Sequence, residues 1–304
     1  MDYILLLLGL IGLFAGGEAL VRGAVGIAQR LAMSPLLIGL TVVGFGTSTP
    51  ELLVSVDAAL RGVPDIAIGN VVGSNIGNIL LIVGLSALVW PIRVSRGTLR
   101  RDLAVMLAAA VVLMPLFWSG MLGRPAGLVL VVALLAYLAW AWLAQGEPEA
   151  EAMATSRPLW RSLIWVLLGL AALMLGARWL VDGAVAIART YGVSEAFIGL
   201  TIVAVGTSLP ELATSIIAAL RRQSEIAIGN IVGSNIFNVL GILGVTALVA
   251  PIPVAGRFLS FDVPVMIGAS LALAALLLLR PGIGRVTGVA LLLAYAAYVW
   301  AAQG

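Results

Sequence analysis

Two glutamates stand in matching short motifs inside long apolar stretches of the sequence. Glu51 ends the segment Gly-Thr-Ser-Thr-Pro-Glu, and Glu211 ends the segment Gly-Thr-Ser-Leu-Pro-Glu. An ionised carboxylate in the middle of a membrane span costs from about 3 to over 10 kcal/mol, depending on the reference state. Two facing carboxylates also repel each other, so cations or protons must offset their charge. The pair therefore predicts a site that one divalent ion, two monovalent ions or two protons can neutralise.

The residues just before each glutamate predict neutral oxygen ligands. Pro50 and Pro210 each remove one helical hydrogen bond and loosen the preceding turn. Irregular backbone at membrane depth is tolerated where it lines a cavity. The predicted ligands there are the carbonyls of Thr47 and Thr207 and the hydroxyls of Ser48 and Ser208. Calcium prefers six to eight such oxygens. Cysteine and histidine are absent, so the usual transition-metal ligands are missing.

A second pair of motifs adds polar side chains at matched positions. The segment 69–78 reads GNVVGSNIGN, and 229–238 reads GNIVGSNIFN. Residues four apart share a helix face, so each segment offers one serine and one asparagine to the same site: Ser74 with Asn78, and Ser234 with Asn238. The remaining asparagines are interpreted as hydrogen-bonding links between helices: Asn70, Asn75, Asn230 and Asn235.

Composition indicates that lipid surrounds these motifs. Of 304 residues, 62% are hydrophobic and only 10% are charged, whereas soluble domains carry about 25% charged residues. A membrane-spanning helix needs about 20 apolar residues, and ten such runs are present. They cover residues 3–29, 34–60, 65–90, 99–119, 124–144, 160–189, 194–220, 224–250, 258–279 and 285–301.

Other classes of protein find no support. There is no basic run with interleaved aromatic residues, so nucleic-acid binding is not indicated. The sequence has no nucleophile–base pair and no cofactor motif, so neither an enzyme nor a bound cofactor is predicted. No feature indicates an obligatory protein partner; the expected surroundings are membrane lipid.

The arginines predict an orientation. Placing the N-terminus outside the cell puts twelve arginines on the inner side and five on the outer side, in line with the excess of positive charge in cytoplasmic loops. Both termini are then outside the cell membrane. The acidic connector 145–157 lies inside and separates residues 1–144 from residues 158–304.

The two halves are copies of one unit. Residues 34–90 align without gaps to residues 194–250, with roughly three residues in five identical. Each half holds five predicted spans, and because five is odd the second copy must cross the membrane in the opposite sense. The fold class is therefore predicted as an all-α integral membrane protein with ten transmembrane helices in two inverted five-helix repeats. Inverted repeats with a midplane site are a transporter architecture.

Three oppositely charged pairs at i, i+4 spacing are interpreted as ion pairs within helices. These are Glu18 with Arg22, Asp57 with Arg61, and Arg178 with Asp182.

The paired Gly-Thr-Ser-x-Pro-Glu and Gly-Asn-x-x-Gly-Ser-Asn-Ile segments resemble the two alpha repeats of the cation/calcium exchanger superfamily, and most closely its compact prokaryotic sodium/calcium exchangers. The resemblance covers essentially the whole chain. It implies that spans one and six form a gate that slides against a rigid core of eight helices. It also implies central cation ligands at Glu51 and Glu211, sodium contacts from the four motif serines, and sodium-binding carbonyls at Gly44 and Ala204.

One departure from the family pattern concerns the coupling ions. Many members carry an aspartate at one of the positions that match Asn78 and Asn238, and this chain has asparagine at both. Two buried carboxylates remain, which makes potassium co-transport less expected. The hydroxyl-rich Thr-Ser ligands favour a sodium/calcium antiporter, because protons need no extra oxygens. A calcium/proton antiporter stays open, since two glutamates can carry protons. A non-transporting receptor or scaffold of the same fold is the remote alternative.

Overall fold

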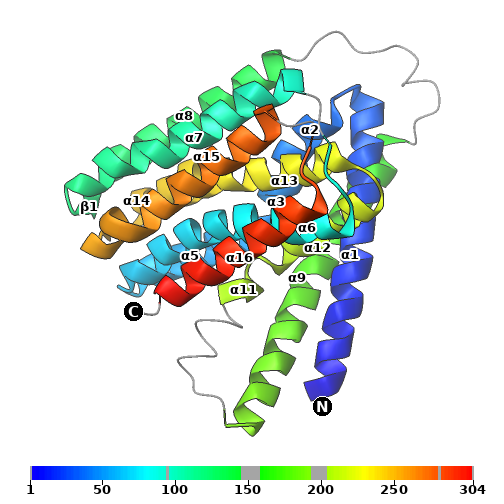
Figure 1. The fold of residues 1–304 in the computed structure, drawn as a ribbon, viewed down its shortest axis with the longest axis horizontal. Coiled ribbons are helices and arrows are strands. Elements are labelled where there is room, and N and C mark those ends of the chain that lie inside the picture. Colours follow the sequence, from blue (N-terminus) through cyan, green and yellow to red (C-terminus); the bar gives the residue numbers. More distant parts are fainter. Residues whose placement is uncertain (1, 94–95, 145–157, 193–203, 280–281, 303–304) are drawn as a thin grey trace.

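The computed structural model describes residues 2–93, 96–144, 158–192, 204–279 and 282–302. In the first half the elements are α1 (Asp2–Leu31), α2 (Pro35–Ile38), η1 (Gly39–Val43), α3 (Gly44–Thr47), α4 (Thr49–Leu60), α5 (Pro64–Gly77), η2 (Asn78–Ile82), α6 (Val83–Val89), α7 (Arg96–Trp118), β1 (Met121–Leu122) and α8 (Arg124–Leu143). The segments labelled η are π-helical. Figure 1 shows the helical bundle that these elements and those of the second half form.

The described part of the second half is also helical apart from one short strand. Its elements are α9 (Leu159–Thr190), α11 (Ala204–Gly206), α12 (Leu209–Leu220), α13 (Ser224–Ile236), η5 (Phe237–Leu243), α14 (Gly244–Val249), β2 (Ile252–Pro253), η6 (Phe258–Asp262), α15 (Val263–Leu279) and α16 (Arg285–Ala302). The two short strands form one antiparallel pair, with Leu122 opposite Ile252.

Eight helices within the described residues are long and apolar enough to cross a membrane, and the count is nine if one bent pair forms a single span. The bent pair joins Pro35–Thr47 to Thr49–Leu60 at 43°. The predicted span 194–220 includes residues outside the described part of the chain. Its described residues form α11 and the 12-residue helix Leu209–Leu220. The all-helical, membrane-spanning fold is confirmed. Ten spans and the inversion of the repeats stay predictions.

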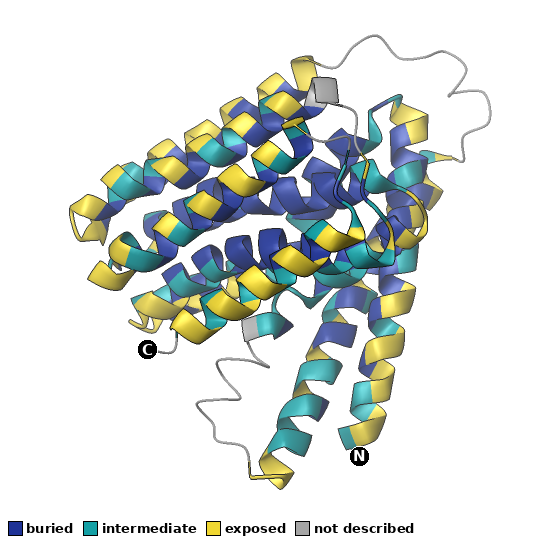
Figure 2. Cartoon of the chain, viewed as in Figure 1, coloured by how far each residue is buried: buried dark blue, intermediate teal, exposed yellow. Residues whose placement is uncertain are grey.

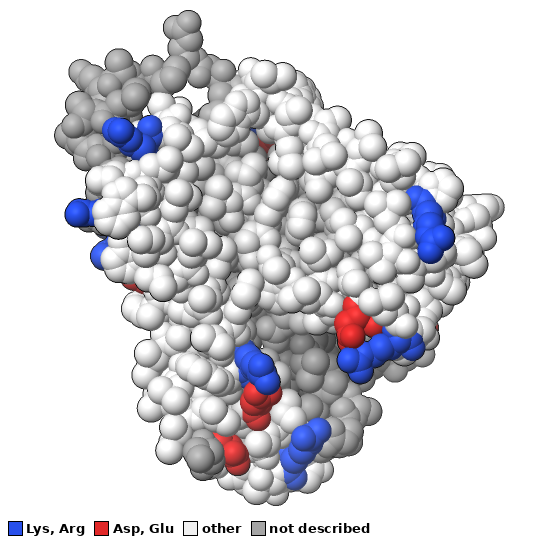
Figure 3. All heavy atoms as spheres, turned by 180° about the vertical axis from the view of Figure 1, so that it is seen from behind, with Lys and Arg blue, Asp and Glu red and all other residues white. Residues whose placement is uncertain are grey.

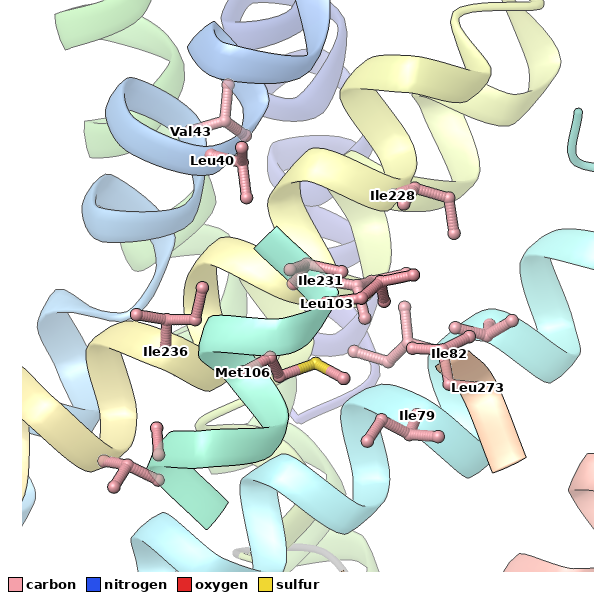
Figure 4. Packing of buried hydrophobic residues seen from close by; sticks show 14 of the residues in the cluster. Leu40, Val43, Ile79, Ile82, Leu103, Met106, Ile228, Ile231, Ile236 and Leu273 are labelled. Atoms are coloured by element: carbon pink, nitrogen blue, oxygen red, sulfur yellow. The ribbon is translucent and has the colours of Figure 1, made fainter. Parts of the chain in front are cut away.

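Burial separates central helices from peripheral ones. Within the most apolar window of each span, 78% of Pro64–Val89 and 83% of Ser224–Val249 is buried, but only 11% of Arg285–Ala302. Figure 2 shows the buried helices in the middle of the bundle and exposed faces around it. In the interior of the bundle, an apolar cluster includes Ile79, Ile82, Met106, Ile231 and Leu273 (Figure 4). The middle of the face drawn in Figure 3 carries no charged side chain, as a lipid-facing surface requires.

Helices α1 and α9 pack side by side along their length and extend beyond the rest of the bundle (Figure 1). Gly9 of α1 faces Leu180, and Gly16 faces Leu173, so the two helices run antiparallel. Corresponding helices of inverted repeats must be antiparallel, so this pair has the geometry that the predicted repeat requires.

The three predicted ion pairs within helices are confirmed. Glu18 and Arg22 are 3.2 Å apart, Asp57 and Arg61 2.7 Å, and Arg178 and Asp182 3.8 Å. Glu18 also forms an ion pair with Arg221, which directly follows α12. That second contact joins α1 to the end of another helix and was not predicted.

Two buried aspartates outside the central motifs hold peripheral helices together. Asp102 of α7 accepts hydrogen bonds from Arg101 Nε at 2.9 Å and from Tyr137 Oη of α8 at 3.1 Å. In the second half, Asp262 accepts bonds from Arg257 Nε at 3.2 Å and from Tyr298 Oη of α16 at 3.0 Å. Each aspartate is therefore neutralised by an arginine and linked by a tyrosine to the next long helix.

Replacing Asp102 with asparagine is expected to destabilise the protein. The change leaves Arg101, whose side chain is 15% exposed, without its carboxylate, and breaking a buried ion pair costs about 3–5 kcal/mol. Such a loss corresponds to a fall in Tm of about 5 °C or more for a chain of this size. The Tm of the purified protein in detergent measures it. The matched control is Asp57→Asn, because the side chain of Asp57 is 58% exposed; it should shift the Tm little. Equal Tm values for the two variants would contradict the expectation.

Candidate cation site

Each glutamate motif breaks its helix as predicted. Helix α3 ends at Thr47, and Ser48 leaves the helical conformation with φ −84° and ψ 7° before α4 begins. In the second half, Ser208 has φ −90° and ψ 7° before α12. Pro50 and Pro210 lie at the first positions of the new helices, where a missing N–H costs little. The break places each glutamate in the first turn of a helix, whose N-terminal dipole favours negative charge.

The two carboxylates are buried and linked crosswise between the halves. Glu51 and Glu211 are each 1% exposed. Ser48 Oγ donates to Glu211 Oε1 at 2.9 Å, and Ser208 Oγ donates to Glu51 Oε1 at 3.4 Å. The second oxygen of each carboxylate, Oε2, has no hydrogen-bond partner among the described residues. Each glutamate therefore keeps one buried oxygen available for a cation.

The asparagines of the second motif form another crosswise network. Asn78 Nδ2 donates to Asn235 Oδ1 at 3.0 Å, and Asn238 Nδ2 donates to Asn75 Oδ1 at 2.9 Å. Asn75 and Asn235 also donate to each other's backbone carbonyls, which confirms their predicted role as links between helices. Asn78 Oδ1 and Asn238 Oδ1 remain buried without a partner in the described chain.

Seven buried side-chain oxygens of the described residues lack a hydrogen bond. Three are the hydroxyls of Ser86, Thr214 and Thr246, and the other four are one oxygen on each of Glu51, Glu211, Asn78 and Asn238. An unsatisfied buried polar atom costs about 1–3 kcal/mol, and more when it is charged. Such atoms require an explanation in a native structure, and ion binding is one of the accepted ones. The four on glutamate and asparagine belong to the residues that the sequence analysis selected for the site. They are oxygens, the ligand atoms that calcium and sodium take.

Asn70 and Asn230 donate hydrogen bonds to the backbone carbonyls of the two glutamates. Asn70 Nδ2 donates to the backbone carbonyl of Glu51 at 3.0 Å and to Ser55 Oγ at 2.9 Å. Asn230 makes the matching bonds to the carbonyl of Glu211 and to Ser215 Oγ, at 3.2 and 2.9 Å. These bonds confirm both asparagines as links between neighbouring helices.

The other predicted ligands differ in how far their oxygens are already engaged in hydrogen bonds. Ser74 Oγ is 3.3 Å from Ser208 Oγ, and Ser208 is the serine that bonds to Glu51. The carbonyl of Gly44 already accepts bonds from Ser48 N, Thr47 Oγ1 and Ser234 Oγ at 3.2–3.3 Å. Thr207 lies between α11 and α12, and Ala204 begins α11. The roles of Gly44, Ala204, Thr47 and Thr207 as ion ligands stay predictions.

A feature that the sequence analysis missed is the π-helical turn beside the asparagines. Segment η2 begins at Asn78, and η5 begins at Phe237, next to Asn238. Single-turn π segments inside α-helices occur frequently at functional sites. Nothing in the residue types of 78–82 or 237–243 distinguishes a π turn from an α turn, so one sequence could not reveal it.

The described residues hold no group of three or more histidine, cysteine, aspartate or glutamate side chains that could hold a metal ion. Two carboxylates and neutral oxygens make a weaker set, with a charge that one divalent or two monovalent cations balance. Such a site suits an ion that binds and leaves, as a transported substrate must.

A buried, paired carboxylate centre in a multi-pass helical bundle is the arrangement of an ion transporter rather than an enzyme. A family model described as "Sodium/calcium exchanger protein" matches residues 1–143 and 161–303. The chain therefore belongs to the sodium/calcium exchanger family.

Individual relatives cover nearly the whole chain. It is 40% identical over 312 residues to the putative antiporter CaxA of Alkalimonas amylolytica, covering 97% of this chain and 96% of that one. It is 33% identical to the sodium/calcium exchanger MaX1 of Methanosarcina acetivorans, with 98% and 97% covered. A solved structure of the sodium–calcium exchanger NCX_Mj has a TM-score of 0.87 and 35% identity, over 98% of this chain and 97% of that one. A more distant relative, the Ca²⁺/H⁺ antiporter ChaA of Bacillus subtilis, is 28% identical over 66% of this chain and 64% of its own length.

Proposed function

We propose that this protein exchanges sodium for calcium across the cell membrane by alternating access, with Glu51 and Glu211 as ligands shared by both ions. The observation that carries the proposal is the pair of carboxylates, each bonded by a serine of the other half and each with an unpartnered buried oxygen. Both ions compete for the same two negative charges. An empty site would leave those charges uncompensated in the membrane, so the protein reorients only when it is loaded.

Alternating access is supported by unequal packing of the two halves. Helix α1 packs against α12. In the other half α9 corresponds to α1 and α4 to α12, and these two helices share no comparable contact in the described chain. If the repeats are inverted, these two contacts close opposite sides of the membrane, so one side is closed and the other open. The Glu18–Arg221 ion pair belongs to the closed side. The corresponding positions of the other half are Arg178 and Arg61, so no such ion pair can form there.

Calcium-45 uptake into sodium-loaded proteoliposomes tests the proposal directly. The vesicles are diluted into buffer that contains neither sodium nor potassium, and uptake should require internal sodium. No calcium movement under any imposed sodium gradient would refute sodium/calcium exchange. Uptake that appears only after potassium is added would leave the fold assignment intact and make the exchange potassium-dependent.

The second candidate is a calcium/proton antiporter, and the similarity to ChaA favours it. Protons can neutralise two glutamates without any further ligand, whereas the hydroxyls of Ser48 and Ser208 that bond to them suit a metal ion. A pH gradient imposed without sodium separates the two. Calcium uptake driven by that gradient alone would replace sodium by protons in the proposal.

The amides of Asn78 and Asn238 are expected to limit competition by protons. Asn78→Asp adds a third buried carboxylate, which repels Glu51 and Glu211 and is relieved by binding a proton. We expect calcium uptake by this variant to fall more steeply than that of the parent protein between about pH 8 and pH 6. Asn238→Asp is the matched variant in the other half and should behave alike. Parallel pH profiles for all three proteins would contradict this role of the amides.

A further inference from the structure

A cavity of about 660 Å³ lies apart from the carboxylate pair, at one end of the bundle. The segment after α6, the turn between α12 and α13, and the start of α16 come together there (Figure 1). Its lining includes three arginines and one glutamate: Arg93, Arg222, Arg285 and Glu225. None of the three arginines lies within ion-pair distance of an acidic group in the described chain. The lining therefore has three positive side chains against one negative, an excess of positive charge.

Two of these arginines are not required by the repeated fold. Arg285 Nε donates to the carbonyl of Leu88, and Arg124 makes the matching bond to the carbonyl of Leu248, at 3.1 and 3.2 Å. That arginine is thus a structural feature of both halves. Arg93 and Arg222, by contrast, correspond to Pro253 and Gly62. The opposite end of the molecule keeps the same backbone turns without these charges.

The backbone conformation at Arg222 is a further difference between the two matching turns. Its φ is +59°, in the left-handed region that favours glycine, and Gly62 has φ +71° at the matching turn. The guanidinium of Arg222 stacks on the Trp90 ring at 4.6 Å, and Trp90 corresponds to Ala250 in the other half. Stacking uses the face of the guanidinium and leaves its N–H edge free to donate hydrogen bonds.

The walls of the cavity are fixed. Ile92 and Ile283 exchange backbone hydrogen bonds at 3.0 and 2.9 Å, which hold the segment with Trp90 and Arg93 against the segment that leads into Arg285. Helix α13 begins at the cavity with Ser224, and no side chain caps its N-terminus. Its free N–H groups add to the positive potential that the arginines create. Fork-shaped guanidinium groups around such a space match the oxygens of a phosphate.

We propose that this cavity binds a phosphate group, carried either by an anionic phospholipid headgroup or by free phosphate. Helix ends line the cavity, which places it at the level where spans leave the membrane and headgroups lie. Basic pockets between spanning helices bind anionic headgroups. In the predicted orientation this is the cytoplasmic side.

The test compares the parent protein with the double variant Arg93→Gln/Arg222→Gly. Glycine suits the backbone at 222, and Arg222→Gly alone serves as the second variant if the double variant unfolds. The control is Arg30→Gln/Arg100→Gln, which removes two exposed arginines on the same predicted side but outside the cavity. Native mass spectrometry measures binding of phosphatidylglycerol and of phosphatidylcholine to each protein in detergent. A second arm measures the shift in Tm caused by inorganic phosphate against chloride at equal ionic strength.

We expect phosphatidylglycerol to bind the cavity variant about 30-fold more weakly than it binds the parent, while the control variant and phosphatidylcholine show no change. That result identifies a lipid headgroup. If lipid binding is unchanged but the phosphate-induced rise in Tm is lost in the cavity variant alone, the ligand is free phosphate. If neither probe distinguishes the cavity variant from the control, the proposal is wrong.

Discussion

Replacing Glu51 with glutamine is expected to abolish calcium uptake while leaving the protein folded. The side chain keeps its size and one oxygen, but the site loses one of its two negative charges. Calcium affinity depends strongly on the number of charged ligands, so we expect it to fall on the order of 100-fold or more. Because the replacement also removes a buried charge, the Tm of the empty protein should be equal to or higher than that of the parent. Glu211→Gln should behave in the same way.

Sodium transport should be weakened less than calcium transport in these variants. One remaining carboxylate is balanced by one monovalent ion, so sodium–sodium exchange, followed with sodium-22, should be weakened less than calcium uptake. This difference separates a loss of ligand charge from general damage to the protein. Asp65→Asn makes the same chemical change at an exposed carboxylate at the start of α5 and should retain calcium uptake. Sodium-dependent calcium uptake by folded Glu51→Gln protein would show that the carboxylate is not a ligand.

The glutamates were predictable because their surroundings are extreme. A charged residue beside a proline in an apolar span, present twice at the same spacing, has few structural explanations. The same reasoning identified the helix breaks at Ser48 and Ser208 and the links made by Asn75 and Asn235. The i, i+4 spacing along a helix was enough to predict the three ion pairs within helices.

Contacts between elements that are distant in the sequence were harder to predict. Asp102 and Asp262 stand at the same offset as the two glutamates, and that spacing could have identified them as a pair. Their partners Tyr137 and Tyr298 lie on other helices, however, and only the packing brings them together. The unequal ends of the molecule were also missed. Arg93 was interpreted only as part of an orientation signal, because its neighbours Arg222 and Arg285 come from other parts of the chain.

The glycines of α1 and α9 are the other feature that only the packing could reveal. A Cβ atom on Gly169 would lie 2.5 Å from the backbone N of Leu20, and one on Gly9 would lie 2.5 Å from the backbone N of Leu180. These two contacts correspond to each other in the two halves. Backbone atoms cannot turn aside as a side chain can, so any larger residue must push the helices apart. Small residues at such contacts let membrane helices approach closely.

Gly169→Ala is therefore expected to reduce both stability and transport. Overpacking at a close contact costs about 1–3 kcal/mol, which corresponds to a fall in Tm of several degrees. If α1 and α9 move as one unit during exchange, as the family resemblance implies, their separation should also lower calcium uptake by about tenfold or more. Gly9→Ala should have a similar effect, because it alters the corresponding contact.

The matched control is Gly268→Ala in α15, an exposed position where a Cβ atom would meet no described atom within 4 Å. Alanine favours helix by about 1 kcal/mol over glycine, so this variant should be at least as stable as the parent and transport normally. Both Tm and calcium uptake are measured for the three variants. Two outcomes are informative about the gate. If Gly169→Ala and Gly9→Ala lose stability but keep their transport rate, close packing holds the two helices together without being needed for their movement. If all three variants match the parent, α1 and α9 do not make the close contact described here.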